Sequence, residues 1–219
     1  MKLRYYAIAA TLVLATLIAY ALAYPSLPAR IPTHWNVHGQ VDGYGSPRTL
    51  LFLGPGLMAL MIALFAALPW LSPRRFAIET FEKTYLGIML VVVALPGYLF
   101  TVVLWSAITG PGDVARALML GICVVGLTIG NVLGKVRRNF FIGIRTPWTL
   151  ASERTWYATH RFAGKAIVAA SALGAVLCLA GAPAWAVIAL ILTGFLAPVA
   201  YSLVFFKRLE REGNLDVAA

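Results

Sequence analysis

The segment that follows the first apolar stretch gathers side chains that resemble metal ligands. His34, His38 and Asp42 recur every four residues in a stretch rich in proline and glycine. Those prolines and glycines exclude a long helix, on which residues four apart would share a face. On an extended strand His34 and His38 would lie about 13 Å apart, too far to bind one ion without an intervening turn. We therefore expect no metal site here, and Asp42-Gly43 predicts a tight turn.

A second set of residues, Ser152, Glu153 and His160, contains the side-chain types of a hydrolase. On a helix, Glu153 and His160 would be separated by about 10 Å along the axis, and Ser152 and His160 would lie farther apart. No nucleophile elbow or pair of metal ligands accompanies them. The sequence therefore predicts no catalytic site, and nothing in it indicates a bound cofactor.

Composition identifies the elements that must position these residues. Hydrophobic residues make up 61% of the 219 residues, charged residues only 12%, and the mean hydropathy is +0.83. A soluble domain carries about 25% charged residues, so this chain requires lipid around it. Stretches without Asp, Glu, Lys or Arg that are long enough to cross a bilayer run over 5–24, 50–71, 86–108, 117–133, 166–182 and 185–206. Each must be helical, because lipid offers no partner for an unpaired backbone amide.

The sequence thus predicts an all-α integral membrane protein with six transmembrane helices in one membrane domain. Residues 1–71 would form the first helix pair with an outer loop at 25–49, and 72–134 the central pair. Residues 135–165 would form a cytoplasmic loop with an interfacial helix, followed by the last pair and tail at 166–219. The outer loop is expected to be a short β-hairpin or an ordered loop, because Thr33–Val37 has strand-compatible residues.

The basic residues predict the orientation of these helices. With the N-terminus inside, 15 of the 18 Lys and Arg residues lie in inner segments. Outside lie Arg30, Arg48 and Arg116. The positive-inside rule therefore predicts both termini in the cytoplasm and a location in the plasma or inner membrane. It also explains the net charge of +10 without direct binding of nucleic acid.

The first apolar stretch resembles a signal peptide, since Lys2 and Arg4 precede it and Ala21-Leu22-Ala23 ends it. Its length of about 20 residues exceeds that of a typical signal-peptide core, so we expect a retained first helix.

Polar and small residues within the predicted spans indicate helix contacts. Gly126, Gly130 and Gly134 recur every four residues, a spacing that lets a neighbouring backbone approach closely. Asn131 is expected to bond a neighbouring helix.

The inner loop predicts a helix that starts at Thr146-Pro147 or Thr149 and runs along the membrane surface into the fifth span. Its aromatic and basic faces fit two roles. One is an anchor at the lipid interface, and the other is a docking surface for a cytoplasmic partner.

Both loops contain strings that resemble a known family. The outer string resembles a bacterial and archaeal membrane module of unknown function through Leu27-Pro28, Arg30-Ile31-Pro32-Thr33-His34-Trp35-Asn36, Gly39 and Asp42-Gly43-Tyr44-Gly45-Ser46. The inner string resembles the SdpI family through Asn139-Phe140-Phe141-Ile142-Gly143-Ile144-Arg145-Thr146-Pro147-Trp148-Thr149-Leu150, Ser152-Glu153, Trp156 and Thr159-His160-Arg161. The order of the two strings and the predicted topology are also similar to that family.

The resemblance implies a function and a set of binding residues. It implies a membrane immunity and sensor protein that confers resistance to a membrane-active peptide toxin and recruits a cytoplasmic winged-helix repressor. The outer positions that would face the toxin are His34, Trp35, Asn36, Gly39, Asp42, Gly43 and Tyr44. The inner positions that would bind the partner are Arg145, Thr146, Pro147, Trp148, Glu153, Trp156, His160 and Arg161.

Two other functions remain open from the residues alone. A small transporter or exporter would need a polar cavity among the spans, and Pro96-Gly97 and Pro198 are candidates for broken helices beside one. The lack of Asp, Glu or His in the spans argues against proton or sodium coupling. A membrane-embedded enzyme would need convergent polar groups, which the sequence does not indicate.

Overall fold

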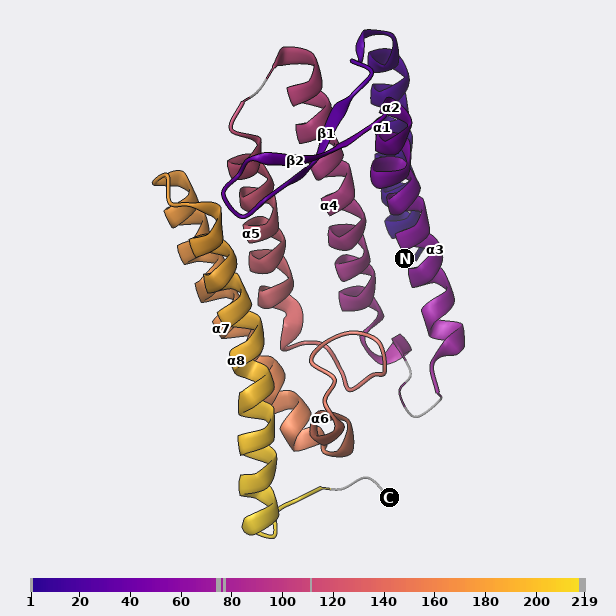
Figure 1. Ribbon diagram of the computed structural model, residues 1–219. Helices are drawn as coiled ribbons and strands as arrows, with labels where there is room; N and C mark the ends of the chain where they lie inside the picture. The colour runs from indigo at the N-terminus through magenta and orange to yellow at the C-terminus, as the bar shows by residue number, and fades with distance from the viewer. Residues whose placement is uncertain (1, 74–75, 77, 111, 217–219) are drawn as a thin grey trace.

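The computed structural model describes residues 2–73, 76, 78–110 and 112–216 (Figure 1). Within those residues, six helices are long and apolar enough to cross a membrane, which confirms the predicted all-α fold. The spanning helices are α1 Lys2–Ala23, α2 and α3 (Pro47–Leu51 and Leu57–Leu71) joined by a π-helical turn at Phe52–Gly56, α4 Glu82–Thr109, α5 Val114–Leu133, α7 Glu153–Leu179 and α8 Ala184–Arg211. The remaining elements are strands β1 Ile31–Trp35 and β2 Val41–Gly45, the short helix α6 Pro147–Ala151, and 3-10 turns at Tyr24–Ser26 and Ile78–Phe81.

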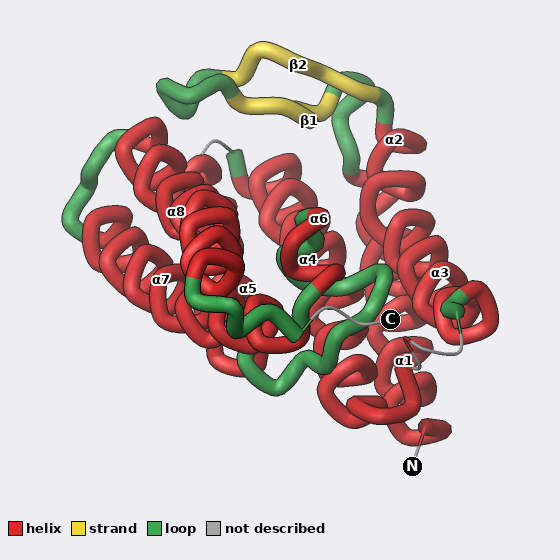
Figure 2. Tube along the Cα trace, turned by 90° about the horizontal axis from the view of Figure 1, so that it is seen from below, coloured by secondary structure: helices red, strands yellow, loops and turns green. Residues whose placement is uncertain are grey.

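The helices form two groups that meet along one seam. Helix α4 packs against α1, α3 and α5, whereas α7 packs against α5 and α8. Seen from below, α7 and α8 lie on one side of α4 and α5, and α1 and α3 on the other (Figure 2). A continuous hydrophobic core joins the groups and includes Ala9 of α1, Met89 of α4 and Trp156 of α7. The α4–α5 seam is therefore the junction between the two halves.

The glycine-rich face of α5 meets α7 at very short range, as its spacing predicts. A Cβ atom added to Gly164 of α7 would lie 2.7 Å from the carbonyl oxygen of Gly130, and one added to Gly130 would lie 3.1 Å from that of Gly164. The prediction for Asn131 is wrong, because its side chain is exposed. Successive helical residues differ by about 100° in direction, so contact through Gly130 turns Asn131 away from α7.

The predicted hairpin is present, but its turn lies elsewhere. Strands β1 and β2 pair antiparallel, with Ile31 opposite Gly45 and Trp35 opposite Val41. The connection is 36–40, where the Asn36 side-chain oxygen accepts backbone hydrogen bonds from His38 at 2.9 Å and Gln40 at 3.0 Å. The prediction of a tight turn at 42–43 is therefore wrong: both residues lie within β2, since Asn36 already supplies the turn's hydrogen bonds.

The hairpin and the 135–152 loop lie at opposite ends of the bundle (Figure 1). We call these the hairpin end and the basic end. At the basic end, Thr146 and Pro147 start α6, as predicted, but the predicted helix is interrupted at Ser152, whose backbone is extended. Helix α7 then runs from Glu153 into the fifth span. Trp156 and His160 of α7 are fully buried, so this stretch packs against protein rather than lying on lipid. Arg74 and Arg75, two of the predicted inner basic residues, lie outside the described residues.

Candidate functional site

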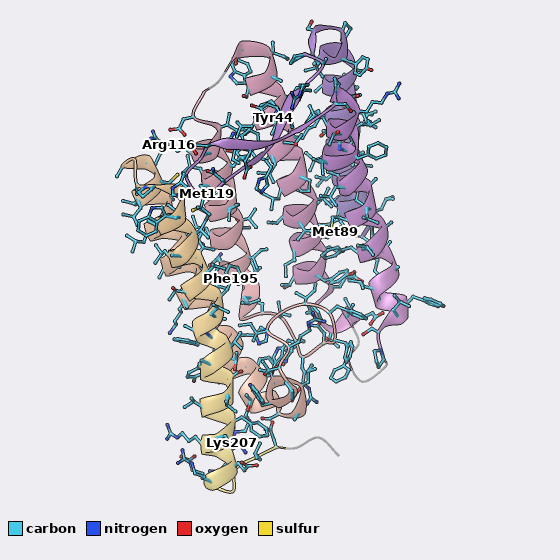
Figure 3. All side chains as sticks on the ribbon, viewed as in Figure 1. Tyr44, Met89, Arg116, Met119, Phe195 and Lys207 are labelled. Carbon is cyan, nitrogen blue, oxygen red and sulfur yellow. The ribbon has the colours of Figure 1, made fainter. Side chains whose placement is uncertain are left out.

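The hairpin covers a cavity of about 810 Å³ in its half of the bundle. From the hairpin, the lining residues are Thr33, His34, Trp35, Asn36, Val37 and Asp42. From the helices they include Leu53 and Leu57, Leu99 and Phe100 of α4, Met119 of α5 and Ile188 of α8. Figure 1 shows the hairpin crossing in front of α4 and α5, and Figure 3 places Met119 on α5 close to it. Five separate segments thus converge on this hairpin cavity.

Every cavity-lining residue contributed by the helices is apolar. The π-helical turn shapes one wall, because it brings Gly54 against the ring of Phe100, where an added Cβ would lie 2.5 Å from the ring. Pro96 faces the cavity from α4, but this helix continues from Glu82 to Thr109, so the break predicted at Pro96 is not present. A wall without charge or hydrogen-bonding side chains favours apolar ligand groups.

Polar groups enter the cavity lining only from the hairpin, among the residues that the structure describes. The Nδ1 atom of His34 lies 2.5 Å from a carboxylate oxygen of Asp42, and the two side chains are 71% and 44% exposed. An exposed pair of this kind adds little to folding stability. Both groups therefore remain accessible to a ligand at the rim of the cavity.

The predicted outer residues divide into two sets. His34, Trp35, Asn36 and Asp42 line the cavity. The other three have different positions: Gly39 approaches Ala115 of α5, Gly43 packs on His34, and Tyr44 is exposed with the Arg30 guanidinium 4.9 Å from its ring centre.

The sequence did not identify the apolar walls as part of a site. Leu57, Leu99, Met119 and Ile188 lie in four different helices and look like ordinary lipid-facing residues in the sequence. The one local signal was Gly54-Pro55-Gly56, which is unusual within an apolar span and forms the π-helical turn.

At the basic end, buried polar side chains hold the irregular 135–152 loop. The side chain of Asn139 accepts hydrogen bonds from the amides of Phe141 and Ile142 and donates to the carbonyls of Arg137 and Ile142. All of its hydrogen-bonding capacity is used within the loop, so Asn139 has a structural role.

His160 holds the next part of the same loop. Its Nε2 accepts the Ile144 amide at 3.0 Å, and its Nδ1 lies 2.8 Å from the Trp156 carbonyl oxygen. This pattern requires a neutral ring with the proton on Nδ1. Gly143 has a φ of 110°, and a Cβ atom added to it would overlap the Nε2 atom of His160. No larger residue therefore fits at this position.

Helix α6 is tied to α8 through hydroxyl and indole groups. Thr146 and Thr149 form a reciprocal cap at the start of α6. The indole nitrogen of Trp148 donates to the Ser202 hydroxyl at 2.5 Å. The Thr146 hydroxyl lies 3.3 Å from the same Ser202 hydroxyl, so the predicted residues Thr146 and Trp148 both connect α6 to α8.

The C-terminal tail folds back onto the start of α7. Ser152 caps this helix and donates its hydroxyl to Asp216 at 2.5 Å, and the Arg154 amide donates to the same carboxylate at 3.0 Å. Burial raises the pKa of Asp216, but the hydrogen bonds from Ser152 and Arg154 outweigh it and hold the pKa of this carboxyl below its usual range. The contact is therefore present at neutral pH and is lost only as the pH falls through that lowered pKa.

The predicted inner residues also divide by exposure. Trp156 and His160 are fully buried and position the surface rather than forming it. Those that are exposed are Arg145, Pro147, Glu153 and Arg161. The indole nitrogen of Trp156 donates to the Val136 carbonyl at 2.8 Å, which connects the start of the loop to α7.

Two segments of the chain match known protein families. Residues 135–202 match the SdpI/YfhL protein family, and 11–59 match a domain of unknown function, DUF1648. The chain is 27% identical over 157 residues to the Immunity protein SdpI of Bacillus subtilis (strain 168), covering 71% of this chain and 72% of that protein. No solved structure matches the chain. These matches agree with the resemblance of the two strings: residues 135–202 are similar to the SdpI/YfhL protein family, and the segment that contains the hairpin is similar to DUF1648.

Proposed function

We propose that this chain is a membrane immunity protein that binds apolar side chains of a membrane-active peptide toxin in the hairpin cavity. The observation that carries the proposal is the combination of apolar helix walls and a polar hairpin around about 810 Å³. The similarity to a protein named for immunity supports the same function.

The chemistry of the cavity fits an amphipathic peptide. Small-molecule sites typically measure about 300–1,000 Å³, so the cavity takes a few side chains of a peptide rather than a whole helix. Apolar side chains would be buried against Leu99 and Met119, while peptide polar groups would meet His34, Asn36 and Asp42. A cationic residue of the peptide would be attracted by the Asp42 carboxylate.

The proposal also includes the orientation of the protein in the membrane, which is inferred from the distribution of its basic residues. The basic end faces the cytoplasm, with both termini, and the hairpin faces the outside, because this arrangement puts 15 of 18 basic residues inside. A cytoplasmic repressor of the winged-helix type would then meet the exposed residues Arg145, Pro147, Glu153 and Arg161.

A cavity-filling variant tests toxin binding. We expect Leu99→Trp, which fills the cavity from α4, to abolish protection of deletion-strain cells against cationic and amphipathic peptides that the wild-type chain resists. Leu192→Trp is the matched control, because Leu192 is 52% exposed on α8 and does not line the cavity. Immunoblots of membrane fractions would establish equal amounts of both variants. Equal survival of deletion and wild-type cells across the peptide panel would refute the immunity function.

The transporter alternative predicted a polar cavity among the spans. The hairpin cavity is apolar wherever helices line it, and its polar groups come from the hairpin. This lining favours binding of an apolar peptide segment over passage of a polar solute.

A further inference from the structure

An apolar groove also follows the α4–α5 seam and ends at two lysines. Near the basic end it has a volume of about 250 Å³ and is lined by Lys83, Gly87, Val91, Thr128 and Lys135 among others. It continues toward the hairpin end as a hollow of about 290 Å³, which shares Val91 and Thr128 and reaches Tyr98. Because the two parts share lining residues from both helices, they form one α4–α5 groove.

The two lysines at the rim differ from Lys2 and Lys207, which lie at the same end. Both Lys83 and Lys135 are exposed, and in the described part of the chain neither ammonium lies in an ion pair. By contrast, Lys2 is paired with Glu82 at 2.8 Å and Lys207 with Glu210 at 2.7 Å. Two unpaired positive charges beside one groove attract an anion.

The interior of the groove has room for a hydrocarbon chain. A Cβ atom added to Gly87 would meet no atom within 4 Å, so this glycine leaves open space just inside the lysines. From Lys83 to Tyr98, α4 rises about 22 Å at 1.5 Å per residue. Half of a bilayer's hydrocarbon core is about 15 Å thick, so the groove is long enough for one acyl chain with its head group at the rim.

We propose that the α4–α5 groove binds an anionic phospholipid. Its phosphate lies between Lys83 and Lys135, and one acyl chain extends past Gly87 and Val91 toward Tyr98. Basic pockets between spanning helices on the cytoplasmic side are suited to anionic head groups. A free phosphate ion would leave the apolar part of the groove unfilled, and a zwitterionic lipid would bring no net charge to the lysines.

The α4–α5 groove is distinct from the hairpin cavity, because neither Lys83 nor Lys135 lines the cavity. The upper part of the groove and the cavity share Leu95 as a lining residue. A lipid bound in the groove would contact both α4 and α5, and so would link the two helix groups across their seam. Lipid binding and peptide immunity can therefore fail independently.

Native mass spectrometry of the purified full chain in mild detergent tests the proposal. The ligands are phosphatidylglycerol, phosphatidylcholine with the same chains, and glycerol phosphate, which has no chain. The charge variant is Lys83→Gln with Lys135→Gln, and its matched control is Lys165→Gln with Lys207→Gln, two exposed lysines that do not line the groove. Gly87→Leu fills the groove without changing charge.

We expect the wild-type chain to bind phosphatidylglycerol more tightly than phosphatidylcholine and not to bind glycerol phosphate. Each lysine near a membrane surface contributes about fivefold to affinity, so the charge variant should bind phosphatidylglycerol about 30-fold more weakly while the control does not change. Gly87→Leu should weaken binding of both lipids. Equal affinity of the charge variant and its control, unchanged binding by Gly87→Leu, or tight binding of glycerol phosphate would each overturn the proposal.

Discussion

His160 shows how one side chain holds an irregular loop against a helix. Its two ring nitrogens join the Ile144 amide to the Trp156 carbonyl, and its ring stacks on Trp156 with centroids 4.0 Å apart. The resemblance to the SdpI family placed His160 among the partner-binding candidates. Burial assigns it a structural role, which the spacing along α7 could not indicate.

Replacing His160 should destabilise the protein without touching the exposed surface. His160→Ala leaves the partly buried Ile144 amide without its acceptor, a loss of about 1–3 kcal/mol in the free energy of unfolding before any cost of the cavity. A thiol-reactive dye can follow thermal unfolding in detergent, because both Cys123 and Cys178 are free and buried.

The neighbouring exposed residue provides the control for that measurement. Arg161→Ala should change the free energy of unfolding by less than about 0.5 kcal/mol. If His160→Ala unfolds at the same temperature as Arg161→Ala, the structural role of the imidazole is wrong.

At the scale of elements, the α5–α7 contact depends on two glycines. Gly130 and Gly164 let the helix backbones meet, because a Cβ atom on either residue would crowd the carbonyl oxygen of the other, at 2.7 Å or 3.1 Å. The four-residue spacing on α5 indicated this face correctly. The partner on α7 was not predicted, because pairing of helices depends on their arrangement in space.

Gly164→Ile should therefore separate α5 from α7. The added side chain collides with backbone, which cannot move aside as a flexible side chain can, so we expect a loss of at least about 1–3 kcal/mol. The same dye assay measures it. Gly87→Ala is the control, because this helical glycine faces open space and should tolerate a methyl group. Similar unfolding temperatures for the two variants would contradict the close contact.

The whole molecule has one proposed recognition surface at each end, and the side of the membrane on which each lies is predicted from charge. An even number of spanning helices puts the start of α1 and the end of α8 at the end opposite to the hairpin, where Lys2 pairs with Glu82 at the start of α4. Charge asymmetry then favours the cytoplasm for that end, with Lys207 at its far tip in Figure 3.

Cysteine labelling tests this orientation. Ser46→Cys lies at the hairpin end and Asn214→Cys at the basic end, and both positions are exposed. We expect a membrane-impermeant maleimide to label Ser46→Cys in intact cells and Asn214→Cys only after permeabilisation. The wild-type chain is the control, since its two cysteines are buried. Labelling of both variants from the same side would rule out the topology.

The amino-acid sequence by itself determined the six spanning helices, the hairpin segment and the contact face of α5. These features depend on local hydropathy, on turn-forming residues and on helical periodicity, all of which are readable along the chain. Only the tertiary structure decided where the hairpin turn lies, that Trp156 and His160 are buried, and that Leu57, Leu99, Met119 and Ile188 share one cavity. Burial and convergence depend on how separate helices pack, and in an apolar membrane chain a cavity wall and a lipid-facing residue have the same composition.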